Sequence, residues 1–323
     1  MNADILLKVE NLRKYFTVKR GFPNPVKLTV KAVDGVSFEV QRQESFGIVG
    51  ESGCGKSTVG RCIIRLVDPD AGRVLFHGED ILPLDKPRMQ KLRRKMQIIF
   101  QDPYGSLNPR LKVGKTLMEP LFVHRLGTRR EIQQTIDRIL EDVGLQPETL
   151  GKFPHEFSGG QRQRIAIARA LIFQPELIIA DEPVSALDVS IQSQILLLME
   201  KLQVEYKLSY IFVAHDLAVV RYFCQRVAIM YLGRIVEQGE RNCLFDNPLH
   251  PYTRALLAAS PIPDPRVRRQ LARLEGEVAS AIDPPTGCHF HPRCPECREI
   301  CRQEYPSWHW VSPNQGVACH LYV

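Results

Sequence analysis

The residues with the clearest chemical potential lie between positions 50 and 58, where glycines surround a lysine and two hydroxyl groups. Their order, Gly-Glu-Ser-Gly-Cys-Gly-Lys-Ser-Thr, fits the pattern G-x-x-x-x-G-K-[S/T], in which backbone N–H groups turn inward around phosphate oxygens. We expect Lys56 to reach the β- and γ-phosphates of a nucleotide and Ser57 to bind magnesium. The nucleotide contacts predicted in this P-loop are Gly50, Glu51, Ser52, Gly53, Cys54, Gly55, Lys56, Ser57 and Thr58.

Two adjacent carboxylates form a second candidate group. They are Asp181 and Glu182, and they follow the apolar run Leu177 to Ala180, which predicts a buried strand. Because α/β sheets bind ligands beyond the carboxyl ends of their strands, we expect Asp181 to hold the magnesium shell. Glu182 is then expected to orient and polarise an attacking water molecule. Surface charge is the alternative, but the complete P-loop upstream favours the catalytic interpretation.

These groups must be positioned by a strand, a loop and a helix in that order. Ser45 to Val49 predicts the buried strand, and Ser57 to Leu66 has a helical period. Apolar residues alternate from Leu6 to about Val40, with turn residues at Arg20 to Pro25, which indicates antiparallel strands. Residues 85 to 175 are helical in period and interrupted by prolines, so they predict a helical subdomain inserted into an α/β core.

The segment Phe157 to Arg164 reads Phe-Ser-Gly-Gly-Gln-Arg-Gln-Arg and precedes a helical run, Ile165 to Phe173. It resembles the signature of the ABC ATPases, with Phe in the place usually taken by Leu. In that family the signature of one subunit covers the ATP held by the P-loop of another. Ser158, glycine backbone and a helix N-terminus can form an anion-binding cup, although a simple helix cap is the alternative. The contacts predicted here are Ser158, Gly159, Gly160 and Gln161.

The other motifs of that family follow in the expected order. Gln101, after the predicted strand at residues 96–100, resembles the Q-loop glutamine, which implies a magnesium and water sensor that also touches a membrane partner. Residues 185–188 resemble the D-loop. His215 resembles the switch histidine near the γ-phosphate. Phe16 is similar to the aromatic residue that stacks on adenine, with Tyr15 as the rival.

Two further segments, residues 100–109 and 247–257, are similar to the oligopeptide and dipeptide importer ATPases, most of all to the second of their two ATPase subunits. The resemblance implies an ATP-hydrolysing subunit that powers import of di- or oligopeptides. Its implied partners are a different ATPase in a heterodimer, two membrane-spanning permease subunits and an extracytoplasmic solute-binding protein, with no nucleic acid. Importers of nickel, glutathione or sugars share this subfamily, and a soluble, non-transport ABC complex is a rival from another class.

Length and composition agree with an α/β P-loop NTPase core. We predict an ABC ATPase domain at residues 1–246, with an N-terminal antiparallel β subdomain and the helical subdomain at about 85–175. Residues 247–323 are predicted to form a loop-rich extension that carries five of the nine cysteines. The net charge of +7 suits phosphate ligands, anionic lipid or nucleic acid without choosing among them. No apolar run approaches a membrane span and no export signal opens the chain, so the expected location is peripheral, on the cytoplasmic face of the inner membrane.

The cysteines of the extension suggest a metal site. In a reducing compartment such a cluster is more typical of metal binding than of disulfides. The segment at residues 287–295 is similar to the tail of peptide-importer ATPases, some of which carry a 4Fe–4S cluster. The ligands this resemblance implies are Cys288, Cys294, Cys301 and Cys319. Zinc is the alternative, because Cys294 and Cys297 form a C-x-x-C pair, and unligated thiols are the third interpretation.

Overall fold

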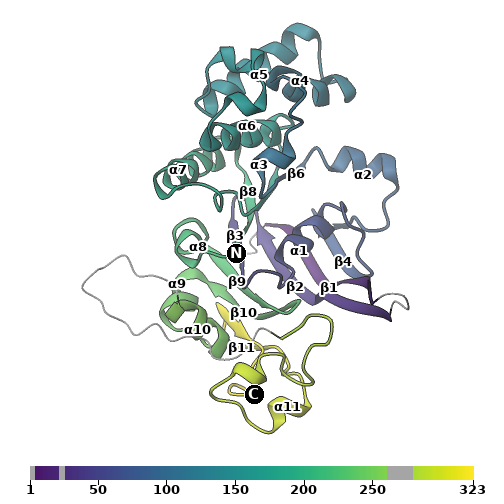
Figure 1. Cartoon of the computed structure of the whole chain (residues 1–323), viewed down its shortest axis with the longest axis vertical. Coiled ribbons are helices and arrows are strands. Elements are labelled where there is room, and N and C mark those ends of the chain that lie inside the picture. Colours follow the sequence, from purple (N-terminus) through teal and green to yellow (C-terminus); the bar gives the residue numbers. More distant parts are fainter. Residues whose placement is uncertain (1–3, 22–25, 260–278) are drawn as a thin grey trace, which may run out of the picture. The chain divides into compact units, whose positions relative to one another are not determined.

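A computed structural model describes residues 4–21, 26–259 and 279–323 of the chain (Figure 1). It contains two compact units. The first comprises Met1–Gln41, Ser45–Pro83 and Val213–Val323, and the second comprises Arg42–Glu44 and Leu84–Phe212. Most of the turn predicted before residue 26, and the prolines at 261, 263 and 265, lie outside the described residues.

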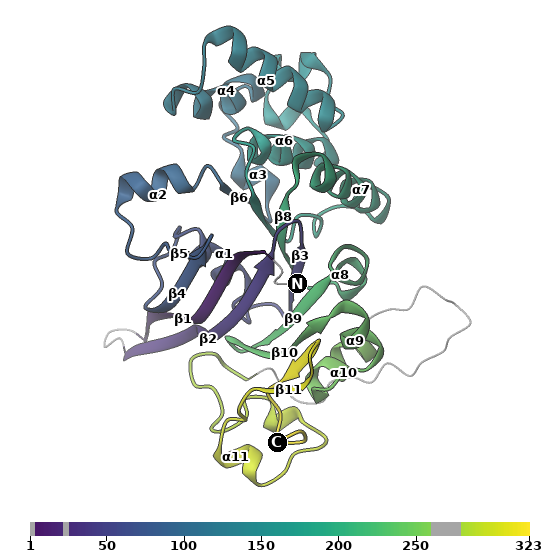
Figure 2. The ribbon, with the colours of Figure 1, turned by 180° about the vertical axis from the view of Figure 1, so that it is seen from behind.

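A four-stranded antiparallel sheet opens the first unit (Figure 2). Its long pair is β1 (Ile5–Arg20) and β2 (Val26–Gln41), which confirms the antiparallel strands predicted from alternation. The sheet continues through β4 (Ala71–Phe76) and β5 (Glu79–Asp80) in the order β2-β1-β4-β5. Alternate side chains of β1 are buried because successive residues of a strand point to opposite faces.

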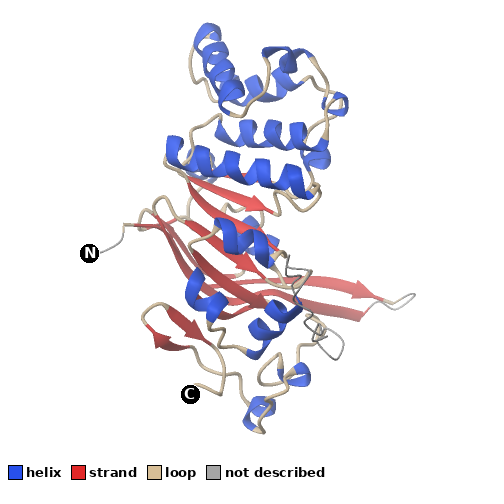
Figure 3. Ribbon diagram, turned by 90° about the vertical axis from the view of Figure 1, so that its left-hand side faces the viewer, coloured by secondary structure: helices blue, strands red, loops and turns tan. Residues whose placement is uncertain are grey.

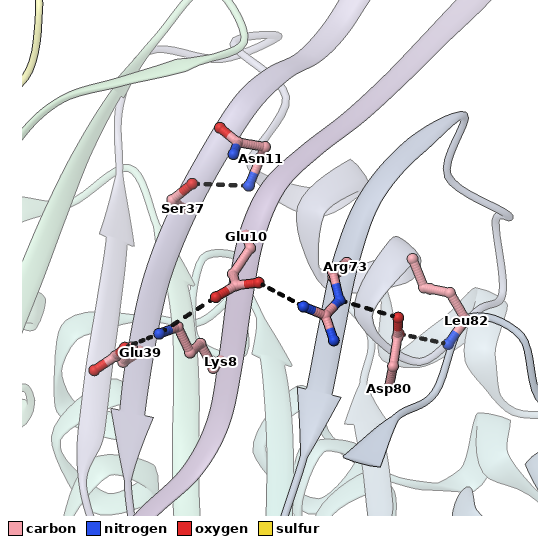
Figure 4. A network of polar contacts seen from close by, with 8 residues as sticks. All are labelled: Lys8, Glu10, Asn11, Ser37, Glu39, Arg73, Asp80 and Leu82. Carbon is pink, nitrogen blue, oxygen red and sulfur yellow. Dashed lines mark hydrogen bonds and ion pairs between the residues drawn. The ribbon is translucent and has the colours of Figure 1, made fainter. Parts of the chain in front are cut away.

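The other face of this sheet carries a chain of ion pairs (Figure 4). Lys8 bonds to Glu39 over 3.0 Å and to Glu10 over 3.3 Å. Arg73 continues the chain to Glu10 over 3.5 Å and to Asp80 over 3.4 Å. These side chains are partly exposed, and such pairs contribute about 0 to 1 kcal/mol each. The network therefore lies on the partly exposed face of the sheet and contributes little to its stability.

The first unit also contains strands in parallel and antiparallel pairing, and the P-loop follows one of them. β3 (Ser45–Val49) runs parallel to β9 (Arg226–Tyr231), which forms a hairpin with β10 (Arg234–Glu240) through the turn at Leu232-Gly233. The helices of this unit are α1 (Lys56–Ile63), α8 (Leu217–Phe223), α9 (Arg241–Asp246) and α10 (Pro251–Ala259). α8 packs on β3, and α9 packs on β9 and β10.

The C-terminal tail belongs to the first unit and adds strands that the sequence analysis did not predict. β12 (Gln315–Val317) pairs with β10, and β11 (His309–Ser312) pairs with β12. A short turn, η3 (His291–Arg293), and α11 (Ile300–Gln303) precede them. The described part of residues 247–323 therefore shares a compact unit with the P-loop, and the domain boundary after residue 246 stays a prediction.

The second unit is mostly helical (Figure 3). Its α-helices are α2 (Lys86–Leu92), α3 (Pro103–Ser106), α4 (Val113–Val123), α5 (Arg129–Asp142), α6 (Gly159–Leu171) and α7 (Val189–Tyr206). Two 3₁₀ turns, η1 (Pro147–Gly151) and η2 (Pro154–Glu156), lie between α5 and α6. The strands β8 (Ser209–Ala214), β7 (Leu177–Asp181) and β6 (Met96–Ile99) are neighbours in that order, and the chain leaves this unit within β8.

The helical period predicted for residues 85 to 175 is present, with β6 as the strand inside it. α5 shows why this stretch is helical: Thr128 and Glu131 form a reciprocal capping box at its start. Ile132, Ile136 and Ile139 then bury one face of the helix. Among the residues that the structure describes, no helix is both long and apolar enough to cross a membrane.

Candidate functional site

The P-loop lies between β3 and α1, in the strand, loop and helix order that the motif requires. Its glycines are needed for two different reasons. Gly55 has a φ of +106°, and a Cβ added there would lie 1.9 Å from the carbonyl oxygen of Ala32. A Cβ on Gly50 would lie 2.1 Å from the carbonyl oxygen of Met230. Gly53 has a φ of +80° but open space around it, so it is required for its backbone conformation alone.

Lys56 begins α1 and is 4% exposed. Its ammonium group donates hydrogen bonds to the carbonyl oxygens of Gly50, over 2.8 Å, and Glu51, over 3.0 Å. The ammonium group is therefore bound by the backbone of its own loop, and phosphate oxygens can replace those carbonyls as acceptors. Burial raises the pKa of the neighbouring Cys54, which keeps that thiol protonated.

The two aromatic candidates for adenine stacking lie next to each other on β1 but differ in their surroundings. The hydroxyl of Tyr15 donates a hydrogen bond to Asp34 over 2.6 Å, and Asp34 forms an ion pair with Arg234. Phe16 is 38% exposed, and the ammonium of Lys14 lies 5.5 Å from its ring centroid. The ring of Tyr15 is thus tied into a polar network, whereas Phe16 offers an exposed ring, as a stacking residue must.

Within the second unit, the structure brings Gln101 and Glu182 together. β6 and β7 are parallel neighbours, so the residues that follow them meet at one edge. The side-chain amide of Gln101 donates a hydrogen bond to Oε2 of Glu182 over 2.8 Å. Asp181 is the last residue of β7 and is 1% exposed. Glu182 has a φ of +47°, an uncommon conformation for a non-glycine residue and one that clusters at functional sites.

The predicted signature begins α6, with Ser158 at the N-cap. The hydroxyl of Ser158 accepts from the backbone N–H of Gln161, and the Gln161 side chain accepts from the backbone N–H of Ser158. The helix-cap interpretation therefore holds locally, and the helix N-terminus that it fixes is also a suitable anion site. A Cβ on Gly160 would lie 2.6 Å from Ile191, so α7 packs too closely for a larger residue there.

The predicted nucleotide residues are divided between the two units. Phe16, the P-loop and His215 lie in the first unit, where His215 follows β8 and is exposed. Gln101, the carboxylates at the end of β7 and the signature lie in the second unit. The roles assigned to these residues from the sequence remain predictions.

Two residues that touch the P-loop were missed by the sequence analysis. The backbone N–H of Glu51 donates to the hydroxyl of Tyr252, over 3.0 Å, and the Glu51 carboxylate accepts two hydrogen bonds from Arg293. Tyr252 lies inside the importer-like segment at 247–257, so a signal for it was present. Nothing in the sequence around Arg293 distinguishes this buried arginine from the exposed arginines of the tail.

The four cysteines predicted as cluster ligands line one small hollow in the first unit. Cys288, Cys294, Cys301 and Cys319 contribute to its wall, and Cys297 does not. Burial raises the pKa of Cys288 to about 12 and that of Cys294 to about 11, so as free groups they are protonated thiols at neutral pH. Among the residues the structure describes, no group of three or more His, Cys, Asp or Glu side chains could hold a metal ion. The expectations of iron–sulfur or zinc therefore stay predictions.

Two family profiles match the chain. The profile "ABC transporter" matches residues 33–185, and "Oligopeptide/dipeptide transporter, C-terminal region" matches residues 236–301. A curated relative, the oligopeptide transport ATP-binding protein AppF of Bacillus subtilis (strain 168), is 50% identical over 324 residues. The match covers 99% of this chain and 98% of AppF, so it includes both the P-loop and the C-terminal tail.

Solved structures with the same fold are ATP-binding cassettes. The CbiO1 protein of Clostridium perfringens, described as part of the ABC transporter complex CbiONQ, matches with a TM-score of 0.64 and 30% identity, over 76% of this chain and 92% of CbiO1. The cassette MJ0796, solved as a dimer in a post-hydrolysis state bound to ADP and phosphate, matches with a TM-score of 0.63 and 31% identity. That match covers 73% of this chain and 98% of MJ0796.

Proposed function

This chain belongs to the ABC transporter family of ATP-binding proteins, and on that premise we propose that it hydrolyses Mg-ATP to power the import of oligopeptides or dipeptides. The observation that carries the proposal is the 50% identity to AppF over almost the full length of both chains. The match to the oligopeptide and dipeptide transporter C-terminal region supports the substrate class, because that region is additional to the ATP-binding cassette.

The proposed nucleotide site uses the residues predicted from the motifs. Lys56 binds the β- and γ-phosphates, the hydroxyl of Ser57 binds magnesium, and Asp181 completes the magnesium shell. Glu182 orients and polarises the attacking water. The hydrogen bond from Gln101 supports this role, since it helps to hold the Glu182 carboxylate in one orientation. His215 is proposed to sense the γ-phosphate, and Phe16 to stack on adenine.

Turnover is proposed to couple two ATPase subunits. ATP held by the P-loop of one subunit contacts Ser158 and Gly160 of another, so loss of the γ-phosphate removes the interaction that favours the closed pair. The dimeric form of MJ0796 with ADP and phosphate supports such an arrangement. We place the chain at the cytoplasmic face of the inner membrane, bound to two permease subunits, with a different ATPase as its partner and an extracytoplasmic binding protein that delivers the peptide.

The tail is proposed to hold a 4Fe–4S cluster through Cys288, Cys294, Cys301 and Cys319. The donor set matches such a group in number and type, because four thiols line one hollow, but these thiols would have to move closer together to bind a metal. When bound, the group would supply structural cross-linking of these chain segments, and zinc is the alternative ion. The thiols must lose their protons to bind it, which the raised pKa values of Cys288 and Cys294 oppose until a metal compensates.

The proposal is tested by peptide uptake into cells that carry the whole transporter. A labelled dipeptide and a labelled pentapeptide are supplied to cells that contain either the wild-type chain or the Glu182→Gln variant, together with the permease and binding-protein subunits. We expect uptake with the wild type and none with the variant. Equal uptake in both, or copurification of the tagged chain with soluble proteins alone, would contradict the assignment.

A further inference from the structure

The tail that carries the cysteines is joined directly to the P-loop through an arginine. Two nitrogens of the Arg293 guanidinium donate to the two carboxylate oxygens of Glu51, over 2.9 Å and 3.0 Å. Glu51 is the second residue of the P-loop, directly after Gly50. The two residues are 242 positions apart in the sequence, and both belong to the first unit.

The ion pair is largely withdrawn from solvent. The side chain of Arg293 is 5% exposed and that of Glu51 is 22% exposed. A planar guanidinium matches a carboxylate with two parallel hydrogen bonds, and this geometry fixes orientation as well as charge.

The same P-loop residue is held at its backbone. The Glu51 N–H donates to the hydroxyl of Tyr252, and the Glu51 carbonyl accepts from Lys56. Tyr252 is fully buried and packs against Phe290, with ring centroids 5.3 Å apart. Phe290 lies three residues before Arg293, so one short stretch of the tail supports both the side chain and the backbone of Glu51.

That stretch is itself built around the cysteines. The backbone N–H of Cys288 donates to the carbonyl of Cys301 over 2.8 Å, and Arg293 donates through its own backbone N–H to Phe290. Arg293 is the last residue of the turn η3 and directly precedes Cys294. Cys288 and Cys294 therefore bracket the turn that aims the guanidinium at the P-loop.

Charge explains why the P-loop needs this partner. A triphosphate carries several negative charges, and Lys56 must bind them. Lys56 lies close to Glu51, because its ammonium group donates to the backbone carbonyls of Gly50 and Glu51. A loose carboxylate on Glu51 would repel the phosphates at close range and compete for Lys56. Arg293 neutralises that carboxylate and holds both of its oxygens.

We propose that Arg293 is a positioning residue of the P-loop, which fixes and neutralises Glu51 and thereby makes ATP affinity depend on the cysteine-bearing segment of residues 287–294. The inference rests on the proposed function, since it concerns the same ATP site. It adds a role for the tail, which supports the ATP site directly and is more than an attachment to the cassette.

The first experiment measures Mg-ATP binding by calorimetry on the purified full-length chain. Arg293→Met should weaken ATP binding by at least about tenfold, the loss of one strong charge-assisted contact. Arg293→Lys, which keeps the charge but not the fork, should fall between Met and wild type. Arg302→Met, at an exposed arginine of the same tail, is the matched control and should bind within about twofold of wild type.

A second variant separates the ion pair from general damage. The double variant Glu51→Gln/Arg293→Met removes both charges, so no charge is left buried without a partner. Its ATP affinity should return to within about threefold of wild type. Circular dichroism and the thermal midpoint establish that each variant is folded. A folded Arg293→Met chain with wild-type ATP affinity would refute the proposal, and so would a double variant as weak as Arg293→Met alone.

A third comparison tests the dependence on the tail. Cys288→Ser should weaken ATP binding in the wild-type background and cause no further loss in the Arg293→Met background, because both changes act through the same contact. Equal losses in the two backgrounds would contradict the coupling. A wild-type chain that binds no ATP would instead refute the proposed function, so the two failures are distinguishable.

Discussion

The side-chain amide of Gln101 donates to Oε2 of Glu182 over 2.8 Å, and this contact joins the loop after β6 to the residue that follows β7. This bond helps to fix the orientation of the Glu182 carboxylate, because the amide donates to one oxygen of it. Glu182 also keeps a left-handed backbone, with a φ of +47°. The surrounding structure thus determines both the backbone and the side chain of the proposed catalytic residue.

We expect Glu182→Gln to bind Mg-ATP with nearly unchanged affinity and to hydrolyse it at least about 100-fold more slowly, because an amide cannot accept a proton from water. Phosphate release and nucleotide binding measure the two effects separately. Glu205→Gln, a change at an exposed residue near the end of α7, is the control and should hydrolyse ATP at the wild-type rate. Near-normal hydrolysis by Glu182→Gln would remove Glu182 from the catalytic role.

Phe16→Ala should weaken ATP binding by about tenfold, since stacking of a base on an aromatic ring contributes about 1 to 3 kcal/mol. Phe16→Trp should retain binding. The comparison with GTP or CTP provides a second readout, because a stacking platform accepts any base.

Tyr15→Phe is the matched control for this pair. It removes the hydrogen bond to Asp34 but keeps a ring, so it should lower stability and leave ATP affinity unchanged. If Tyr15→Phe weakens nucleotide binding while Phe16→Ala does not, Tyr15 is the adenine contact.

Two glycines of the P-loop should differ sharply in their tolerance of alanine. Gly55→Ala should destabilise the chain by about 3 kcal/mol, because its Cβ would collide with the Ala32 carbonyl and its φ of +106° is strained for alanine. Gly53→Ala has space and should cost about 1 kcal/mol from φ alone. Urea unfolding measures both losses of stability. Equal losses would show that the backbone conformation, and not the collision, determines the cost of alanine.

Asp34 should give the fold an acid-sensitive contribution. Burial by itself would raise the pKa of Asp34, but the hydrogen bonds from Tyr15 and Arg234 and the charge of Arg234 offset this and lower it below its usual value. The stability from its charge is therefore complete above about pH 4, the unfolded value, and is lost as pH falls through the lower folded value. Asp34→Asn should be about 2 kcal/mol less stable at pH 7.

This difference from wild type should shrink when the free energy of unfolding is measured below about pH 4. Asp246→Asn is the control, because Asp246 and its partner Arg221 are both more than half exposed. Its effect should stay within about 0.5 kcal/mol at every pH. A constant deficit of Asp34→Asn across the acid range would contradict the linkage.

Metal content should follow the cysteines that line the hollow. Cys288→Ser should lose iron and acid-labile sulfide when the chain is purified without oxygen, whereas Cys297→Ser, outside the hollow, should retain both. Elemental analysis distinguishes the alternatives, because zinc without sulfide would identify a zinc site. Wild-type chain with neither metal would leave the thiols unligated and refute the proposal.

The local parts of the site could be predicted from the sequence because spacing alone determines them. The glycines of the P-loop and the capping box of Ser158 and Gln161 act within a few residues. The meeting of Gln101 with Glu182 could also be anticipated, because each residue follows an apolar run and parallel neighbours end at one edge.

Contacts between distant segments could not be predicted in this way. Arg293 reaches Glu51 across 242 positions, and no local period or composition marks an arginine that will be buried. The strand β12 has only three residues, Gln315 to Val317, too few for alternation to be recognised. Its pairing with β10 depends on a sheet edge that forms elsewhere in the chain.

The pairing of β12 with β10 limits how the chain can be shortened. Gln315 donates to Glu237 over 2.8 Å, and Leu249 and His250 donate to the same buried carboxylate through their backbone N–H groups. A fragment that stops at Asp246 would leave Glu237 without these three donors and would present the backbone of β10 as an open template for other chains. Such a fragment is expected to self-associate, so the smallest well-behaved cassette extends to the C-terminal residues.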